Sequence, residues 1–497
     1  MTDKSIIIIG AGIAGLSTGC YAQMNGYRTH IFELHDKPGG LCTAWKRKGY
    51  TFDGCIHHLA GSGPNSGIHH IWQELGAVQG REMIYRDTLV QVEGPDGEVF
   101  TVYTDPDRLE RHMKELAPAD GSAIEEYVRG VRRFTGLELL ALPALKPLGI
   151  LAALPFLPSL IKWSQVTLGE FATRFTDPFL RRAFPWIQYD LPDIPAMLNM
   201  SFLASCHTRR LGWPVGGSLA FSQAIEQRYR DLGGEIQYRS RVEKILVSDD
   251  RATGVRLEDG TEHRADVVIS AADGHATIFR MLDGRYLNDK IRSYYDAAPT
   301  GPQEMSAHVC LGVARDMAQE PHALTLLLAE PLAIVGETFE RLDVDLFGPD
   351  TGLAPAGKTA LKIPLTAGYA YWRELYDDRA RYKEEKQRVA GAVIEQLEKR
   401  FPGLKDQVEV VDVSTPVTVE RYTGNWRGMQ AWPGGGPMDM LSGVSKTLPG
   451  LENFHMVGQW ALGTIGISTA AIAGRKLVEN LCRRDGRRFV TTVGPTR

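Results

Sequence analysis

The chain has no uninterrupted stretch of about twenty apolar residues, so a conventional membrane span is not expected. Its six cysteines lack the pairing and spacing of a zinc site, which predicts no metal centre and favours reduced thiols in a cytoplasmic protein. The formal net charge is only -4 and no long basic tract is present, so no nucleic-acid partner is expected. The apolar run 6–9 is too short for a signal-peptide core, so no secretion signal is expected.

The first sixty residues carry the strongest pattern. Residues 5–9 read as a buried parallel strand, and residues 10–15 follow at once as Gly-Ala-Gly-Ile-Ala-Gly. Residues 16–25 have helix-forming composition and end at a glycine, and residues 28–32 read as a second strand. This order of strand, glycine loop, helix and strand predicts a Rossmann-type dinucleotide site.

Each glycine of the loop has a physical role in that site. Gly10 permits the tight turn, Gly12 lets a pyrophosphate approach the backbone, and Gly15 lets the helix pack on the strand. Ile13 and Ala14 lie at the start of the helix, where free N–H groups and the positive end of the helix dipole favour phosphate.

Glu33 ends the second strand, about twenty residues after the glycine loop. A carboxylate there accepts hydrogen bonds from both hydroxyls of an adenosine ribose and repels a phosphate on that ribose. The sequence therefore predicts FAD or NAD as the cofactor and disfavours NADP.

The segment after Glu33 decides between FAD and NAD. Residues 35–40 read His-Asp-Lys-Pro-Gly-Gly, and residues 52–58 read Phe-Asp-Gly-Cys-Ile-His-His. Here the sequence resembles the FAD-dependent amine oxidase and phytoene desaturase superfamily, and most of all its carotenoid isomerase and retinol saturase branch, which has a Gly-Ile-His-Tyr-like string where this chain has Cys-Ile-His-His. The resemblance implies FAD, with Gly39, Gly40, Leu41 and His57 along the cofactor.

A second glycine-rich segment lies near the other end of the chain. Residues 453–457 read as a strand, and Gly458, Gln459, Gly466 and Ile467 lead into a helix. An ordinary amphipathic helix would explain this segment alone, but paired with the first loop it indicates one shared cofactor. The resemblance implies that this segment contacts the ribityl chain and that its helix dipole faces the N1–C2=O edge of the flavin.

The region between these segments continues the resemblance. Residues 213–218, Trp-Pro-Val-Gly-Gly-Ser, match a family string near the flavin, and Val242 is implied to contact the adenine through its backbone. Short strands are expected at 235–238, 242–247, 252–257 and 262–269, as the turns between them indicate. A string at 414–425 resembles one that precedes the last flavin segment. No second GxGxxG follows a strand, so a dedicated nicotinamide domain is not predicted.

These patterns predict an α/β protein. The expected fold is a discontinuous, glutathione-reductase-like Rossmann-type FAD-binding domain with an inserted mixed α+β substrate domain that carries an apolar helical region. The predicted FAD-binding parts are residues 1–85, 206–285 and 426–497, and the predicted substrate-domain parts are 86–205 and 286–425.

The apolar helical region covers residues 137–163 and is interrupted by four prolines and a lysine. Three interpretations remain open: a buried helical hairpin, which is somewhat favoured, a monotopic patch through which a lipid enters the active site, and a transmembrane hairpin, which is the least favoured.

The predicted function is FAD-dependent hydride transfer to or from a C–C or C=C bond of a long apolar substrate such as a carotenoid or retinoid. Desaturation, saturation and isomerisation remain open, as does the electron acceptor. His57 and His58 are the candidate acid or base, and packing beside the flavin is an equal interpretation of both. An FAD-dependent amine oxidase and a flavin-free lipid-binding chaperone on the same scaffold are the alternatives.

Other side chains allow two interpretations each. The pairs Arg132–Arg133 and Arg209–Arg210 match a carboxylate-binding role less well than a solvated surface. The remaining candidates are aromatic residues that would line a substrate cavity or pack in a core: Trp426, Trp432 and Trp460.

Overall fold

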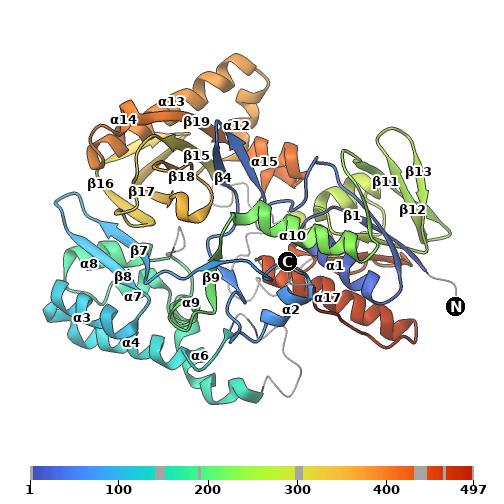
Figure 1. Ribbon diagram of the computed structural model, residues 1–497, viewed down its shortest axis with the longest axis horizontal. Coiled ribbons are helices and arrows are strands. Elements are labelled where there is room, and N and C mark those ends of the chain that lie inside the picture. The colour runs from blue at the N-terminus through green and yellow to red at the C-terminus, as the bar shows by residue number, and fades with distance from the viewer. Residues whose placement is uncertain are drawn as a thin grey trace.

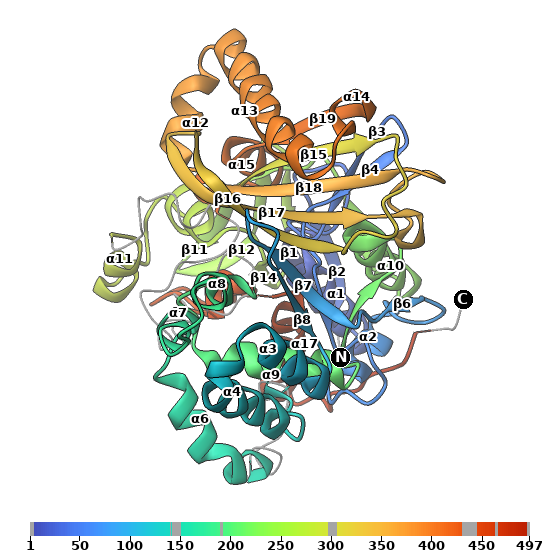
Figure 2. The same cartoon turned by 90° about the vertical axis from the view of Figure 1, so that its left-hand side faces the viewer.

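The computed structural model of the chain describes residues 4–139, 141, 151–188, 192–296, 306–429, 445–462 and 466–494 (Figure 1). Two large sheets organise it. A parallel sheet lies on one side of the molecule, and a mixed sheet with a helical layer beneath it lies on the other (Figures 1 and 2). The predicted α/β class is confirmed.

The parallel sheet has the strand order β10-β2-β1-β14-β20 and joins segments from three distant parts of the chain. Its strands are β1 (Ser5–Ile9), β2 (Arg28–Phe32), β10 (Glu235–Gln237), β14 (Val267–Ser270) and β20 (Phe454–Met456). The central position of β1 explains its apolar sequence. Ile6 and Ile8 pack with the helices on one face, whereas Ile7 and Ile9 pack with a small antiparallel sheet on the other.

The two faces of this sheet are covered differently. Helix α1 (Ile13–Met24) packs against α10 (Gly217–Asp231) and α17 (Ile467–Arg484). The other face carries β11 (Val242–Ser248), β12 (Arg251–Leu257) and β13 (Glu262–Arg264).

The single strand expected at 262–269 is wrong. The chain forms β13 and β14 in different sheets, and it turns between them where the N–H of Asp266 donates to the carbonyl of Ser5. The sequence of residues 262–269 does not show where one strand ends and a strand of another sheet begins.

The mixed sheet has the order β19-β15-β18-β17-β16-β7-β8, in which only the described pair β16 and β7 runs parallel. Its strands are β7 (Thr88–Glu93), β8 (Val99–Tyr103), β15 (Ser306–Val313), β16 (Ala323–Ile334), β17 (Glu337–Phe347), β18 (Thr359–Thr366) and β19 (Val408–Ser414). Helices α12 (Tyr369–Tyr376), α13 (Arg379–Arg400), α14 (Leu404–Gln407) and α15 (Pro416–Thr423) contribute to the apolar core of this sheet. Helix α11 (Asp289–Asp296) packs instead with the core beside the parallel sheet. The domain boundaries stay a prediction.

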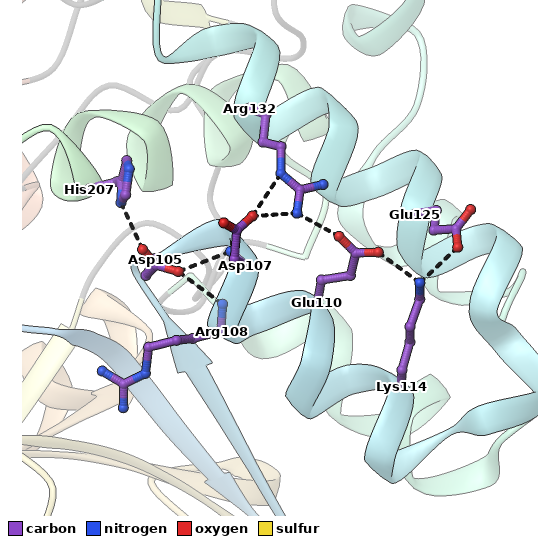
Figure 3. A network of polar contacts seen from close by, with 8 residues as sticks. All are labelled: Asp105, Asp107, Arg108, Glu110, Lys114, Glu125, Arg132 and His207. Carbon is purple, nitrogen blue, oxygen red and sulfur yellow. Dashed lines mark hydrogen bonds and ion pairs between the residues drawn. The ribbon is translucent and has the colours of Figure 1, made fainter.

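A helical layer with its own apolar core lies beneath this sheet (Figure 2). It contains α3 (Pro106–Leu116), α4 (Gly121–Phe134), α6 (Leu157–Ser164), α7 (Leu168–Ala172), α8 (Pro178–Ala183) and α9 (Ala196–His207). Surface ion pairs connect α3 to α4: Arg132 reaches Asp107 and Glu110, both at 2.6 Å (Figure 3). Arg132 therefore has a structural role, as its surface interpretation predicts.

The apolar region is only partly described. Residues 140 and 142–150 lie outside the described residues, and residues 151–164 form a 3₁₀ helix (Leu151–Phe156) and α6. Leu151, Leu154, Leu157 and Ile161 are between 48% and 59% exposed. The buried hairpin is therefore wrong for this part of the region, because one side of it faces solvent.

Short elements connect the two large sheets. They are β3 (Ala44–Arg47), β4 (Tyr50–Asp53), β5 (Leu59–Ala60), α2 (His69–Glu74), β6 (Met83–Ile84), β9 (Leu211–Pro214) and α16 (Gln459–Leu462). Strands β3 and β4 form a hairpin, and β9 pairs with both β5 and β6. Residues 54–58 connect the hairpin β3–β4 to β5.

Candidate active site

The first glycine loop has the geometry that its sequence predicts. Gly10 has φ +98°, and α1 begins directly after Gly12. A Cβ on Gly15 would lie 2.0 Å from the Gly10 carbonyl oxygen, so only glycine fits there. A Cβ on Gly12, in contrast, would meet only the Gly39 carbonyl oxygen at 3.9 Å. The free space beside Gly12 is therefore not needed by the protein fold and suits a ligand that approaches the backbone.

The second glycine pair is fastened to this loop. The N–H of Gly39 donates to the carbonyl of Ala11 at 2.9 Å, and Gly12 and Gly39 form a parallel β-bridge. Gly39 and Gly40 both have positive φ, at +109° and +61°. The two loops thus form one continuous wall of backbone.

The Glu33 carboxylate is buried at the end of β2. It accepts hydrogen bonds from the N–H groups of Ala11 at 2.6 Å and His35 at 2.8 Å. Burial raises the pKa of Glu33, and these hydrogen bonds partly oppose that shift. The side chain is fixed by the glycine loop itself, at the wall of a cavity.

The C-terminal segment closes the same wall. Gly458, with φ +107°, lies against Ala14: a Cβ on Gly458 would be 3.3 Å from the methyl group of Ala14. Helix α17 begins after Gly466, and no side chain caps its N-terminus. Gly466 and Ile467 at this end line a cavity.

This cofactor cavity encloses about 230 Å³. The predicted residues that line it are Gly10, Gly12, Ile13, Ala14, Glu33, Gly39, Gly40, Leu41, Val242, Gly458, Gln459, Gly466 and Ile467. Gly15 lies behind the wall, against Gly10 and Ala271, and His57 lines a neighbouring cavity. A backbone cradle, an uncapped helix N-terminus and a buried acid in one cavity fit a dinucleotide with a pyrophosphate.

The cofactor cavity also contains side chains that the sequence did not indicate, among them Cys42, Cys55 and Asp273. Burial raises the pKa of Asp273 to about 6, and its carboxylate accepts the N–H of Ala276 at 2.7 Å. The aspartate follows the apolar stretch 267–272, and this position at the carboxyl end of a parallel strand is the signal that could have identified it.

His57 and His58 line a second cavity with Arg86, His322 and Asp345. Its other walls are largely apolar and include Ile56, Ile84, Leu89, Leu211, Trp213, Leu346 and Phe347. The segment 55–58 connects the two cavities, because Cys55 lines the first and the next three residues line the second.

A buried ion pair lies behind His57. Asp345 on β17 and Lys362 on β18 are cross-strand partners, with 3.2 Å between Lys362 Nζ and Asp345 Oδ2. Burial opposes both charges, but their attraction prevails: the pKa of Asp345 is lowered and that of Lys362 is raised. His57 Nδ1 lies 3.7 Å from the same Asp345 oxygen.

The imidazoles around this pair are neutral at neutral pH. Burial and the charge of Lys362 lower the pKa of His57 to about 4, although Asp345 opposes the shift. Burial also lowers the pKa of His58 to about 3, that of His308 to about 3 and that of His322 to about 4. The second cavity therefore combines an apolar wall with uncharged imidazoles, the guanidinium of Arg86 and the carboxylate of Asp345, which is paired with Lys362.

The segment that carries His57 is held rigidly. Ser218, at the start of α10, donates its hydroxyl to Asp53 at 2.6 Å and accepts the N–H of Ile56 at 2.8 Å. The indole N–H of Trp213 donates to the carbonyl of Ile56 at 3.0 Å. The family-like string 213–218 thus positions the histidine segment through hydrogen bonds.

The other candidates have different positions. Trp460 lines the cofactor cavity, whereas Trp426 stacks on His275 with 4.2 Å between ring centroids. Trp432 lies outside the described residues. Arg133 packs over the ring of Phe156, and Arg210 donates to the carbonyl of Thr135.

Within the described ranges, no group of three or more histidine, cysteine, aspartate or glutamate residues could hold a metal ion. In the same residues, no helix is both long enough and apolar enough to cross a membrane.

Comparison with known proteins adds to this geometry. Residues 8–75 match the model of the NAD(P)-binding Rossmann-like domain. Prolycopene isomerase of Arabidopsis thaliana is 27% identical over 94% of this chain and 81% of its own length. All-trans-retinol 13,14-reductase of Danio rerio is 23% identical over 96% of this chain and 86% of its own, and a lycopene-forming phytoene desaturase of Paracoccus is 31% identical over 54% and 55%.

Over most of its length the chain is similar to carotenoid isomerases and retinol reductases, as the resemblance to the phytoene desaturase branch implies. It is an FAD-dependent oxidoreductase, and its dinucleotide is FAD, so the flavin-free chaperone is set aside. Putrescine oxidase has the same fold: its structure superposes with a TM-score of 0.62 at 14% identity, over 97% of this chain and 99% of its own.

Proposed function

We propose that this flavoprotein acts on a C–C or C=C bond of a long apolar substrate of the carotenoid or retinoid class. The observation that carries the proposal is the second cavity, whose apolar walls and neutral imidazoles lie next to the cofactor cavity along the segment 55–58. The carotenoid and retinoid names of the relatives support this substrate class. Bound FAD supplies the two-electron chemistry by exchanging a hydride with a substrate carbon.

His57 is proposed as the residue that exchanges a proton with the substrate. It is neutral at neutral pH and so accepts a proton, and Asp345 lies close enough to stabilise the resulting imidazolium. Lys362 keeps Asp345 ionised when His57 is neutral. His58 lines the same cavity and is proposed to shape it for the substrate.

An amine oxidase is the weaker candidate. Two aromatic residues, Trp213 and Phe347, are among the described residues that line the second cavity, and their rings are tilted by 40° with centroids 6.0 Å apart. They therefore do not form a cage of two facing rings for an amine.

An anaerobic titration of the purified holoprotein tests the reaction class. If the enzyme desaturates its substrate, we expect the absorbance bands of oxidised flavin to bleach on addition of a partly saturated polyene. If it saturates or isomerises its substrate, we expect these bands to bleach only with an external reductant, and the reduced enzyme then to convert a retinoid or polyene. A diamine such as putrescine is the matched control. Bleaching by the diamine with no conversion of any polyene or retinoid would contradict the proposal.

The exposed aliphatic face of residues 151–161 is proposed to lie on a lipid surface, from which an apolar substrate enters. It lies at the edge of the helical layer, at the bottom of both views, remote from the parallel sheet (Figures 1 and 2). Leu154 and Ile161 are 58% and 59% exposed, and Leu151 and Leu157 in the same segment are exposed as well. A single exposed aliphatic side chain is ordinary, whereas several in one segment indicate a contact surface.

Replacing both residues, Leu154→Glu with Ile161→Glu, is expected to lower the vesicle-bound fraction of the protein at least tenfold. Burial of one such side chain contributes about 1.5–3 kcal/mol, and a tenfold change corresponds to about 1.4 kcal/mol. Co-sedimentation with phosphatidylcholine and phosphatidylglycerol vesicles measures the effect. Val411→Glu, on the remote strand β19, is the control and should bind like the unaltered protein. Equal binding by all three proteins would show that this face does not contact lipid.

A further inference from the structure

Two cysteine side chains meet at the wall of the cofactor cavity. Hairpin β3–β4 pairs Ala44 with Asp53, and beyond this pair the N–H of Gly54 donates to the carbonyl of Thr43 at 2.9 Å. The next opposed positions are Cys42 and Cys55. Interaction with Cys55 is the largest cause that raises the pKa of Cys42, and both residues line the cofactor cavity.

The surroundings hold this pair in place. Cys42 Sγ lies 3.6 Å from the carbonyl oxygen of Ser218, to which it donates, and the Ser222 hydroxyl donates to the Cys42 carbonyl at 2.6 Å. The N–H of Cys55 donates to Asp53 at 3.0 Å. Both backbones are therefore held in place by α10 and by the hairpin.

The two thiols differ in exposure. Cys42 is 2% exposed, whereas Cys55 is half-buried. The hydrogen bond with Cys55 and burial raise the pKa of Cys42 well above its usual value. Cys55 is thus the more accessible thiol and is oxidised first, and Cys42 is the resolving thiol.

We propose that Cys42 and Cys55 are a redox-active pair that forms a reversible disulfide at the edge of the cofactor cavity. This inference goes beyond the proposed function and does not depend on the substrate. The oxidant is hydrogen peroxide. The sulfur of Cys55 attacks the peroxide, the O–O bond breaks, and one water leaves as a sulfenic acid forms. The sulfur of Cys42 then attacks the sulfenic sulfur, the S–O bond breaks, and a second water leaves. Two thiols lose two electrons and two protons, and one peroxide is reduced to two waters.

Hydrogen peroxide treatment of the holoprotein as purified tests the proposal. We expect the number of thiols that react after unfolding to fall from six to four, since the chain has six free cysteines and one disulfide consumes two. Mass spectrometry of the digested protein should show a peptide that joins Cys42 to Cys55, with a mass lower by two hydrogens than the two reduced peptides. Dithiothreitol should restore six thiols.

Two variants distinguish the pair from an accidental oxidation. In Cys42→Ser, peroxide should carry Cys55 to the sulfinic acid, which dithiothreitol does not reverse, because no partner resolves the sulfenic acid. Cys206→Ser, which removes a buried thiol of the second cavity, is the control and should still form the cross-linked peptide. Six intact thiols in the unaltered protein, or irreversible oxidation of Cys55 while Cys42 stays reduced, would overturn the proposal.

Discussion

Replacing Gly12 with valine is expected to give a folded protein that no longer retains FAD. Gly12 has an ordinary φ of −66°, and a Cβ there would meet only the Gly39 carbonyl oxygen at 3.9 Å. The protein itself therefore tolerates the added atoms. The isopropyl group instead occupies the space through which a pyrophosphate reaches the backbone, so the loss falls on the ligand.

The measurement is the ratio of flavin to protein absorbance after gel filtration, together with the melting temperature. Gly12→Val should carry less than one-hundredth of the normal flavin and should melt like unaltered protein from which FAD has been removed. Gly15→Ala is the matched control from the same loop. Its Cβ would lie 2.0 Å from the Gly10 carbonyl oxygen, so it should melt well below the flavin-free protein. Normal flavin content in Gly12→Val would place the pyrophosphate elsewhere.

Replacing His57 with alanine is expected to lower the turnover number by about 10²–10⁴, the usual contribution of a positioned acid or base. FAD content should be unchanged, because His57 lines the second cavity and not the wall of the first. Turnover of a polyene or retinoid, measured by the product formed per flavin, gives the effect directly.

The cavity left by His57→Ala provides a test that a packing role would fail. Imidazole added to the buffer should restore turnover at least tenfold, since it replaces a group that moves a proton beside Asp345. His322→Ala is the control from the same cavity, and it should lose less than tenfold and gain nothing from imidazole. Unchanged turnover in His57→Ala would limit His57 to packing.

The cofactor site was predictable because its signals are local. A buried strand, a glycine loop and an acid follow one another within residues 5–33, and each is recognisable from its own neighbours. The second cavity was not predictable in the same way. Asp345 and Lys362 lie about 300 residues after His57. They face each other because of the register between β17 and β18. A sequence shows that a strand exists but not which residue faces which.

The buried-hairpin interpretation of the apolar region was wrong for residues 151–161 for a related reason. Its composition indicated a hidden hairpin, yet residues 151–161 turn aliphatic side chains outward, because apolar composition does not show whether protein, lipid or water covers a face. For the arginine candidates, the surface interpretation holds for Arg132. Arg132 has nearby carboxylates on α3, which its position in the sequence did not reveal (Figure 3).

The contact between α1 and α17 has a consequence for how the enzyme is made. A Cβ on Gly474 of α17 would lie 2.2 Å from the Ser17 hydroxyl of α1, so these helices touch although more than 450 residues separate them. A ribosome releases the first glycine loop long before it releases residues 458–484, which complete the wall around the cofactor. Flavin loading therefore follows the emergence of both segments, and the nascent protein must keep its first loop and parallel strands from pairing wrongly until the second segment arrives.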